Sequence, residues 1–257
     1  MDGISAGEKR KKELILRILT IDIGNTAVKG SVFEDGKLLE SILLETRDAE
    51  AIGILARRHS PDGAICCCVG QDADDFVAEM ETETGLEVMQ LTHDTPLPID
   101  VKYATPGTLG LDRIAAAAGA SLIADNAIVV DAGTAITLDI VCGNTFSGGN
   151  ISPGMRLRFR SLNHYTSRLP LVPPAGSLPS FGYDTETAIR SGVVNGIVAE
   201  IASAWRAACA EYPGMHLLLT GGDADFLAPL LREKGVELRQ VSSLVGLGLE
   251  RIFRYNK

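Results

Sequence analysis

The sequence lacks long apolar runs, an excess of basic residues, and the cysteine and histidine spacing of a zinc site. No apolar run approaches the ~20 residues of a transmembrane helix, and no N-terminal apolar segment precedes a small-residue cleavage site. The 24 Lys and Arg against 33 Asp and Glu give a formal net charge of −9, which leaves no extended basic face for nucleic acid. We therefore expect a cytoplasmic protein that binds neither membranes nor nucleic acid.

Cysteine is scarce, and three of the five cysteines are consecutive, at Cys66, Cys67 and Cys68. The Cα atoms of neighbouring residues lie ~3.8 Å apart, below the usual disulfide range, and alternate side chains of a strand face opposite ways. The surrounding run AICCCVG is apolar. We interpret these cysteines as small core residues of a buried strand in a reducing compartment.

The chain is long enough for one large core or two modest domains, at 257 residues of which 46% are hydrophobic. Its hydrophobic periodicity mixes strands with helices, which predicts the α/β class. Strands are expected at 14–44 (a three-stranded meander), 63–70, 86–91, 127–146 (a second meander), 217–219 and 236–239. Helices are expected at 48–59, 72–84, 114–124, 155–168, 186–210, 224–233 and around 247–254.

The first candidate site follows the first apolar strand, which leads into Asp22, Gly24, Asn25, Thr26 and Lys29. Glycine lets backbone N–H groups approach an anion closely, and a carboxylate at the strand end can hold Mg²⁺ directly or through water. The pattern therefore suits a phosphate chain and its metal. An ordinary Gly-Asn hairpin turn is the alternative.

A second copy of this arrangement lies in residues 127–140, where an apolar strand leads into Asp131 and Gly133. Asp22 and Gly24 match this pair at one constant offset. A repeat this far apart indicates two similar half-molecules, because the periods of solenoid repeats are much shorter. Two such turns facing each other across a cleft could hold one triphosphate from both sides, which suggests a kinase.

Further candidates are less specific one by one. Asp112 follows a proline-containing loop at the start of a helix, where capping is the alternative to a site, but a cation such as Arg113 opposes the helix dipole there. Residues 147–154 read as a glycine-rich turn, and Gly221-Gly222 after a strand fits a nucleotide cradle. The long helical pattern at 186–210 allows either core burial or a partner-facing surface.

Taken together, these segments resemble the type III pantothenate kinases, which begin coenzyme A synthesis in many bacteria and have the acetate kinase/sugar kinase/Hsp70/actin fold. The resemblance covers residues 14–257, in the family's order and spacing. It rests on six segments: Asp22-Ile23-Gly24-Asn25-Thr26…Lys29, Pro106…Gly110-Leu111-Asp112-Arg113, Asp131-Ala132-Gly133-Thr134-Ala135-Ile136-Thr137, Gly148-Gly149…Ile151…Pro153-Gly154, Thr185-Glu186…Gly192 and Thr220-Gly221-Gly222-Asp223.

The fold that the resemblance implies has two similar actin-like (ribonuclease H-like) domains with a nucleotide cleft between them. We expect a flexible N-terminal extension at 1–13, an N-terminal domain at 14–125 and a C-terminal domain at 126–257.

The resemblance also implies a reaction, the ATP-dependent phosphorylation of pantothenate to 4'-phosphopantothenate in a homodimer, with Asp112 as the base that accepts the proton of the attacking hydroxyl. Asp131 would bind K⁺ or NH₄⁺, and Asp22 would hold Mg²⁺ through the phosphates. The implied ATP-binding residues are Asp22, Gly24, Asn25, Thr26, Lys29, Gly133, Thr134, Gly221 and Gly222. The implied pantothenate-binding residues are Tyr103, Gly110, Leu111, Asp112 and Arg113, with Thr185 entering from the partner subunit.

Three other functions compete with this one. A regulatory, transcriptional accessory member of the family would leave the kinase site unused, yet every expected catalytic position is filled. A sugar kinase of the same fold is the closest enzymatic alternative, to be separated by its hydroxyl acceptor. An actin- or Hsp70-like ATPase needs extra subdomains, for which 257 residues leave no room.

Overall fold

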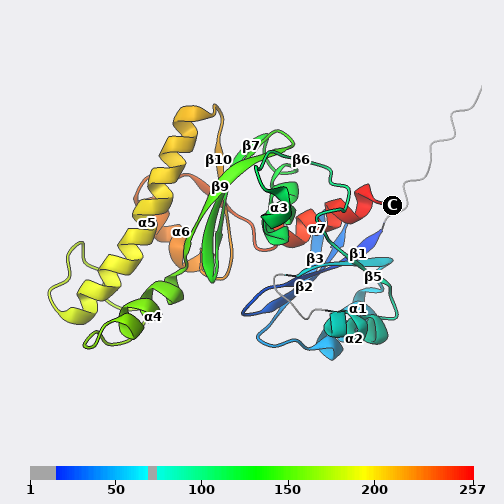
Figure 1. The fold of residues 1–257 in the computed structure, drawn as a ribbon, viewed down its shortest axis with the longest axis horizontal. Coiled ribbons are helices and arrows are strands. Elements are labelled where there is room, and N and C mark those ends of the chain that lie inside the picture. Colours follow the sequence, from blue (N-terminus) through cyan, green and yellow to red (C-terminus); the bar gives the residue numbers. More distant parts are fainter. Residues whose placement is uncertain (1–15, 69–73) are drawn as a thin grey trace, which may run out of the picture.

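The computed structural model describes residues 16–68 and 74–257, so the extension expected at 1–13 lies outside the described residues. Its architecture is mixed α/β with two sheets (Figure 1), which confirms the predicted class. The first sheet has five strands in the order β3-β2-β1-β4-β5. They are β1 (Arg17–Ile23), β2 (Val28–Glu34), β3 (Lys37–Leu44), β4 (Gly63–Cys68) and β5 (Val88–Gln90).

The second sheet has six strands in the order β11-β10-β7-β8-β9-β6. In both sheets an antiparallel meander (β1-β2-β3 or β7-β8-β9) is extended by two parallel strands on the side of its first strand. The predicted repeat is therefore a repeat of topology. The strands are β6 (Asp100–Val101), β7 (Asn126–Ala132), β8 (Ala135–Cys142), β9 (Thr145–Pro153), β10 (His216–Thr220) and β11 (Leu238–Gln240).

Strand β6 pairs in parallel with β9. The chain thus reaches the second sheet before β7 begins, within the range predicted for the first domain. This short edge strand is followed by the 3₁₀ turn η1 (Pro106–Thr108) and helix α3 (Leu111–Ala120).

Helices cover the outer face of each sheet. The covering helices of the first sheet are α1 (Ala49–His59) and α2 (Asp74–Thr84). Their residues, such as Ile52 and Met80, pack against buried side chains of β1 and β2. Helix α1 begins where the Asp48 side chain accepts a hydrogen bond from the Ala51 N–H. On the second sheet the covering helices are α4 (Met155–Tyr165), α5 (Thr185–Glu211) and α6 (Ala224–Glu233).

Helix α5 packs on its own chain through the residues expected to face inward, since Ile189, Val193, Ile197 and Ile201 are all buried. It begins with a capping box in which Asp184 accepts from the Thr187 N–H. Within the described part of the chain, no helix combines the length and apolarity needed to cross a membrane.

Two helices, α3 and α7 (Leu244–Tyr255), lie between the sheets (Figure 1). Glycines let them approach closely, because a Cβ on Gly248 would lie 1.7 Å from the Ala115 carbonyl oxygen and one on Gly119 would lie 2.5 Å from that of Leu244. The buried side chains around them come from both sheets, including Ile18 of β1. This contact holds the start of α3 over the space between the two meanders.

The triple cysteine sequence lies in β4 as predicted. Cys66 and Cys67 are buried, Cys68 is half-buried, and none of the five cysteines forms a disulfide.

One expectation was wrong. Residues 147–154 were expected to form a turn, but residues up to Pro153 belong to β9, which pairs with β8 from Thr145 to Pro153 with one register shift. The pairing overrides the low strand propensity of glycine, and the strand tolerates Gly148 at a φ of 122° beside a register shift between Ile140 and Val141.

Candidate active site

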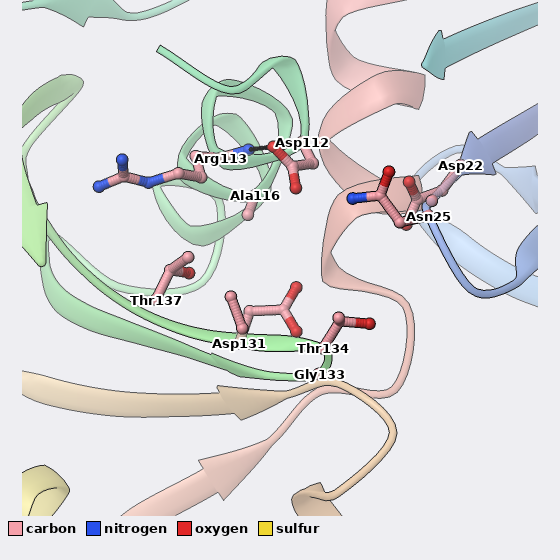
Figure 2. Close-up of a pocket in the computed structure, with 11 residues that line it drawn as sticks. Asp22, Asn25, Asp112, Arg113, Ala116, Asp131, Gly133, Thr134 and Thr137 are labelled. Atoms are coloured by element: carbon pink, nitrogen blue, oxygen red, sulfur yellow. Dashed lines mark hydrogen bonds between the residues drawn. The ribbon is translucent and has the colours of Figure 1, made fainter. Parts of the chain in front are cut away.

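A cleft between the two halves is lined by the β1–β2 turn, the first turns of α3, and the β7–β8 turn (Figure 2). Half of the predicted site residues line it. The lining consists of Asp22, Gly24, Asn25, Asp112, Arg113, Ala116, Asp131, Gly133, Thr134, Ala135 and Thr137. The interpretation of the first turn as an isolated hairpin is therefore incomplete, because this hairpin faces its counterpart from the other half.

The two turns touch directly. The Thr26 and Thr134 hydroxyl oxygens are 2.8 Å apart, and each turn is closed by a backbone bond from its glycine, Gly24 N–H to Ala27 O at 3.0 Å and Gly133 N–H to Ala135 O at 3.0 Å. The hydroxyl groups of the two turns therefore meet at one place, whereas the Gly24 and Gly133 N–H groups are used within their own turns.

Carboxylates from three elements surround this space. Asp22 (β1), Asp112 (α3) and Asp131 (β7) all line the cleft. Burial, and then the charge of Asp112, raise the pKa of Asp22 to about 6. Burial, and then the charges of Asp22 and Asp112, raise the pKa of Asp131 to about 7.

Lys29 on β2, which pairs with Asp22 in the ladder, is the nearby cation. Burial lowers its pKa, opposed by the charges of Asp22 and Asp131. Its ammonium group donates to the Ser242 carbonyl oxygen at the start of α7. Lys29 thus links the β1–β2 hairpin to the helix between the sheets.

The charge of the cleft fits a bound cation. The three carboxyl groups of Asp22, Asp112 and Asp131 outnumber the one ammonium group of Lys29. The charge of Arg113 does not change this balance, because Arg113 already forms an ion pair with a further carboxylate, that of Asp139. The described residues contain no cluster of three or more His, Cys, Asp or Glu that could hold a metal ion. A cation here would complete its shell with water and phosphate oxygens, as Mg²⁺ does in sites built around substrate phosphates.

The Asp112 carboxylate curls over the start of α3. Its Oδ1 accepts from the Arg113 backbone N–H at 2.9 Å, and a Cβ on Gly110 would lie 2.4 Å from the same oxygen. The glycine of the predicted substrate motif therefore makes room for this carboxylate. Leu111, the first residue of α3, completes the motif at this helix end.

The Arg113 side chain runs away from Asp112 (Figure 2) and forms a buried ion pair with Asp139 of β8. The ring of Tyr103 meets that of Phe146 edge to face, with centroids 5.9 Å apart, and Arg113 Cζ lies 5.6 Å from the Phe146 centroid. Asp139 was not among the residues predicted for the site. Its signal was a lone carboxylate within the strand sequence TLDIV, since a buried charge requires a partner.

Gly221 follows β10 with a φ of 95° and packs against the second turn. A Cβ there would lie 2.4 Å from the Ala132 carbonyl oxygen and 2.5 Å from Asp131 Oδ1, and the Asp223 N–H donates to Ala132 at 2.9 Å. Gly222 is exposed next to it.

Thr185 is not among the residues that line the cleft. It is the exposed first residue of α5. The cleft residues Ala116, Ala135 and Thr137 were not singled out as site residues from the sequence, because short aliphatic and hydroxyl side chains carry no distinctive pattern. Cys67 was interpreted as core, yet its thiol lies 3.5 Å from Asp22 Oδ1 as a donor.

Comparison with known sequences identifies relatives over most of the chain. The family model described as type III pantothenate kinase matches residues 18–207. The type III pantothenate kinase of Phocaeicola vulgatus is 36% identical over 241 residues, which is 93% of this chain and 98% of the relative. That of Flavobacterium johnsoniae is 40% identical over 220 residues, 84% of this chain and 89% of the relative.

Solved structures agree on the fold. A Campylobacter jejuni protein assigned to the Baf family of transcriptional activators matches with a TM-score of 0.63 and 25% identity, covering 93% of this chain and 98% of its own. A Listeria monocytogenes protein named as an N-acetylmannosamine kinase matches with a TM-score of 0.54 and 14% identity, covering 94% and 100%. The second likeness shows only the shared two-domain fold.

The raised carboxylate pKa values predict that stability depends on pH. Between about pH 4 and about pH 7 the folded state binds more protons at Asp22 and Asp131 than the unfolded chain does, so stability falls as the pH rises. We predict that Asp131→Asn raises the Tm of the nucleotide-free protein near pH 8 by about 2–8 °C. The gain should largely disappear near pH 4, where Asp131 is protonated in the folded state and about half protonated in the unfolded chain.

Calorimetric unfolding at both pH values checks this prediction. Asp94→Asn, which removes an exposed carboxylate, is the matched control and should leave Tm nearly unchanged at both. An equal Tm change for Asp131→Asn at the two pH values would contradict the electrostatic explanation.

Proposed function

Since the chain belongs to the type III pantothenate kinase family and uses ATP to phosphorylate pantothenate in coenzyme A biosynthesis, we propose that Asp112 is the catalytic base. The observation that carries this proposal is the position of its carboxylate, at the start of α3 beside the cleft where the two phosphate turns meet. A base must lie within reach of the hydroxyl whose proton it accepts. Asp112 would take this proton as the hydroxyl oxygen bonds to the γ-phosphorus of ATP and the bond from that phosphorus to the departing ADP oxygen breaks.

The two turns would hold the triphosphate. Phosphoryl transfer needs positioning and charge neutralisation more than covalent chemistry from the protein. The amides and hydroxyls of both turns, together with Lys29, would supply these interactions, and phosphate oxygens would replace the contact between Thr26 and Thr134. The ATP-binding set is that of the sequence analysis: Asp22, Gly24, Asn25, Thr26, Lys29, Gly133, Thr134, Gly221 and Gly222.

The family uses ATP with a divalent metal, and the excess of carboxylates around the cleft supports a second, monovalent cation. When bound, Mg²⁺ would neutralise the charge of the phosphates. Asp22 would hold it through the phosphates and water. Asp131, whose pKa is raised to about 7 chiefly by burial, would regain its charge beside K⁺ or NH₄⁺.

The pantothenate site would be formed by Tyr103, Gly110, Leu111 and Arg113, close to Asp112. Thr185 would be supplied by a second copy of the chain. The segment before it exposes aromatic side chains, Phe181 at 90% and Tyr183 at 75%, which suits a covered surface. We propose a cytoplasmic homodimer that binds neither nucleic acid nor membranes.

The test of this function is a coupled ADP-release assay with a panel of hydroxyl acceptors. We expect turnover with pantothenate and none with hexoses or N-acetylmannosamine. Turnover with a sugar alone would support a sugar kinase, and the absence of turnover with every acceptor would support a regulatory protein.

The first prediction concerns the base. Asp112→Asn should retain the fold and ATP binding but lower kcat by about two to four powers of ten, because the hydroxyl loses its proton acceptor. Steady-state kinetics measure the loss, and calorimetric titration with ATP serves as the control. Near-normal turnover would leave Asp112 with a purely structural role at the helix start.

The second prediction concerns the cation. Activity should depend on K⁺ or NH₄⁺, and Asp131→Asn should lose most of this dependence together with most of the activity. Rates measured in matched potassium, ammonium and sodium buffers at constant ionic strength provide the test. Equal rates in all three buffers would contradict a monovalent-cation site.

The third prediction concerns the shared site. Asp112→Asn protein mixed with Thr185→Trp protein should recover part of the activity, since a heterodimer then has one site with both lesions and one intact site. Subunit exchange must be verified with differently tagged chains. If exchange occurs without recovery, each chain builds its acceptor site alone.

A further inference from the structure

The feature that the mechanism leaves unused is the ion pair between Arg113 and Asp139. Both side chains are buried, with 6% and 1% exposed. Arg113 Nε lies 3.1 Å from Asp139 Oδ1 and 3.2 Å from Oδ2, and Nη2 also donates to Oδ1. A buried pair of this kind costs desolvation free energy that hydrophobic residues would avoid, so its presence beside the cleft calls for an explanation.

The neighbouring strand is shaped around this pair. Gly149 of β9 lies opposite Asp139 in the ladder. A Cβ at Gly149 would lie 2.2 Å from Asp139 Oδ1, 2.4 Å from the Leu138 carbonyl oxygen and 2.9 Å from Arg113 Nη2. The glycine-rich sequence of β9, which looked like a turn, thus provides the space in which the carboxylate and the guanidinium meet.

The guanidinium is held on its other sides as well. Its Cζ lies 5.6 Å from the centroid of the fully buried Phe146 ring, a cation–π distance. Asp139 takes the Nε and Nη2 edge of the guanidinium, so the donors of Nη1 remain for a bound acceptor.

These contacts reach the catalytic position. The Arg113 backbone N–H donates to Asp112 Oδ1 at 2.9 Å. Arg113, whose side chain is paired with Asp139, therefore also fixes the Asp112 carboxylate. We propose that Asp139 is a positioning residue, which fixes Arg113 and through it the first turn of α3, and that Gly149 is the residue that makes this pairing possible. The inference rests on the proposed roles of Asp112 and Arg113.

Asp139→Asn, which keeps the shape and removes the charge, is the direct test. We expect kcat/KM for pantothenate to fall by about 10²-fold, because misplacement of a reacting group by about 1 Å has such an effect. The affinity for a non-hydrolysable ATP analogue, measured by calorimetry, should stay at the wild-type value. Asp100→Asn, an exposed carboxylate on β6, is the matched control.

Gly149→Ala is a second variant, which keeps both charges and displaces the carboxylate. It should show the same selective loss for pantothenate. In an Arg113→Lys background, Asp139→Asn should cause little further loss, since a residue that acts through Arg113 cannot act twice.

Three results would overturn the inference: wild-type kcat/KM in Asp139→Asn, equal losses for pantothenate and the ATP analogue, or fully additive losses in the double variant. The wild-type protein is assayed alongside. Its failure to phosphorylate pantothenate would overturn the proposed function and this inference together, whereas normal wild-type turnover with one of the three results rejects the inference alone.

Discussion

The close contact between α3 and α7 is the constraint on which the rest of the structure depends. Helix α7 follows the last strand of the second sheet, yet it packs against β1 and β4 of the first. Its approach to α3 requires glycine at Gly119 and Gly248, where any side chain would overlap a backbone carbonyl. Because α3 carries Asp112, this one helix crossing places the proposed base against phosphate turns that come from opposite halves of the chain.

The cleft that results is electrostatically unfavourable in the absence of ligand. Asp22 and Asp131 are half-buried, and their burial, followed by the charges of the neighbouring carboxylates, raises the pKa values of both. Proteins keep such a charge arrangement where a ligand offsets it, and in the proposed function magnesium bound to a triphosphate would offset it. The acceptor side differs, since Arg113 is neutralised within the protein by Asp139. One side of the cleft thus depends on bound ions, and the other is organised by the chain itself.

Local sequence patterns were sufficient to predict the strands and turns that carry the candidate site. The two apolar strands that lead into an aspartate and a glycine were recognisable because hydrophobic runs and glycine turns are short-range features, and both lie where the meanders predicted. The turn expected at 147–154 failed for the complementary reason. The turn was predicted because glycine has an unusually free backbone. In the structure, Asp139 and Arg113 instead occupy the volume that a side chain at Gly149 would fill.

The sequence by itself therefore determined the α/β class, the internal repeat, the order of the elements and the family, all of which depend on residues close together in the chain. Only the tertiary structure decided which side chains meet: Thr26 with Thr134, 108 residues apart, Arg113 with Asp139, and Lys29 with the start of α7. It also decided that β6 joins the second sheet. These contacts follow from how the two sheets pack around α3 and α7, and a buried group takes its partner from space and not from its neighbours in the chain.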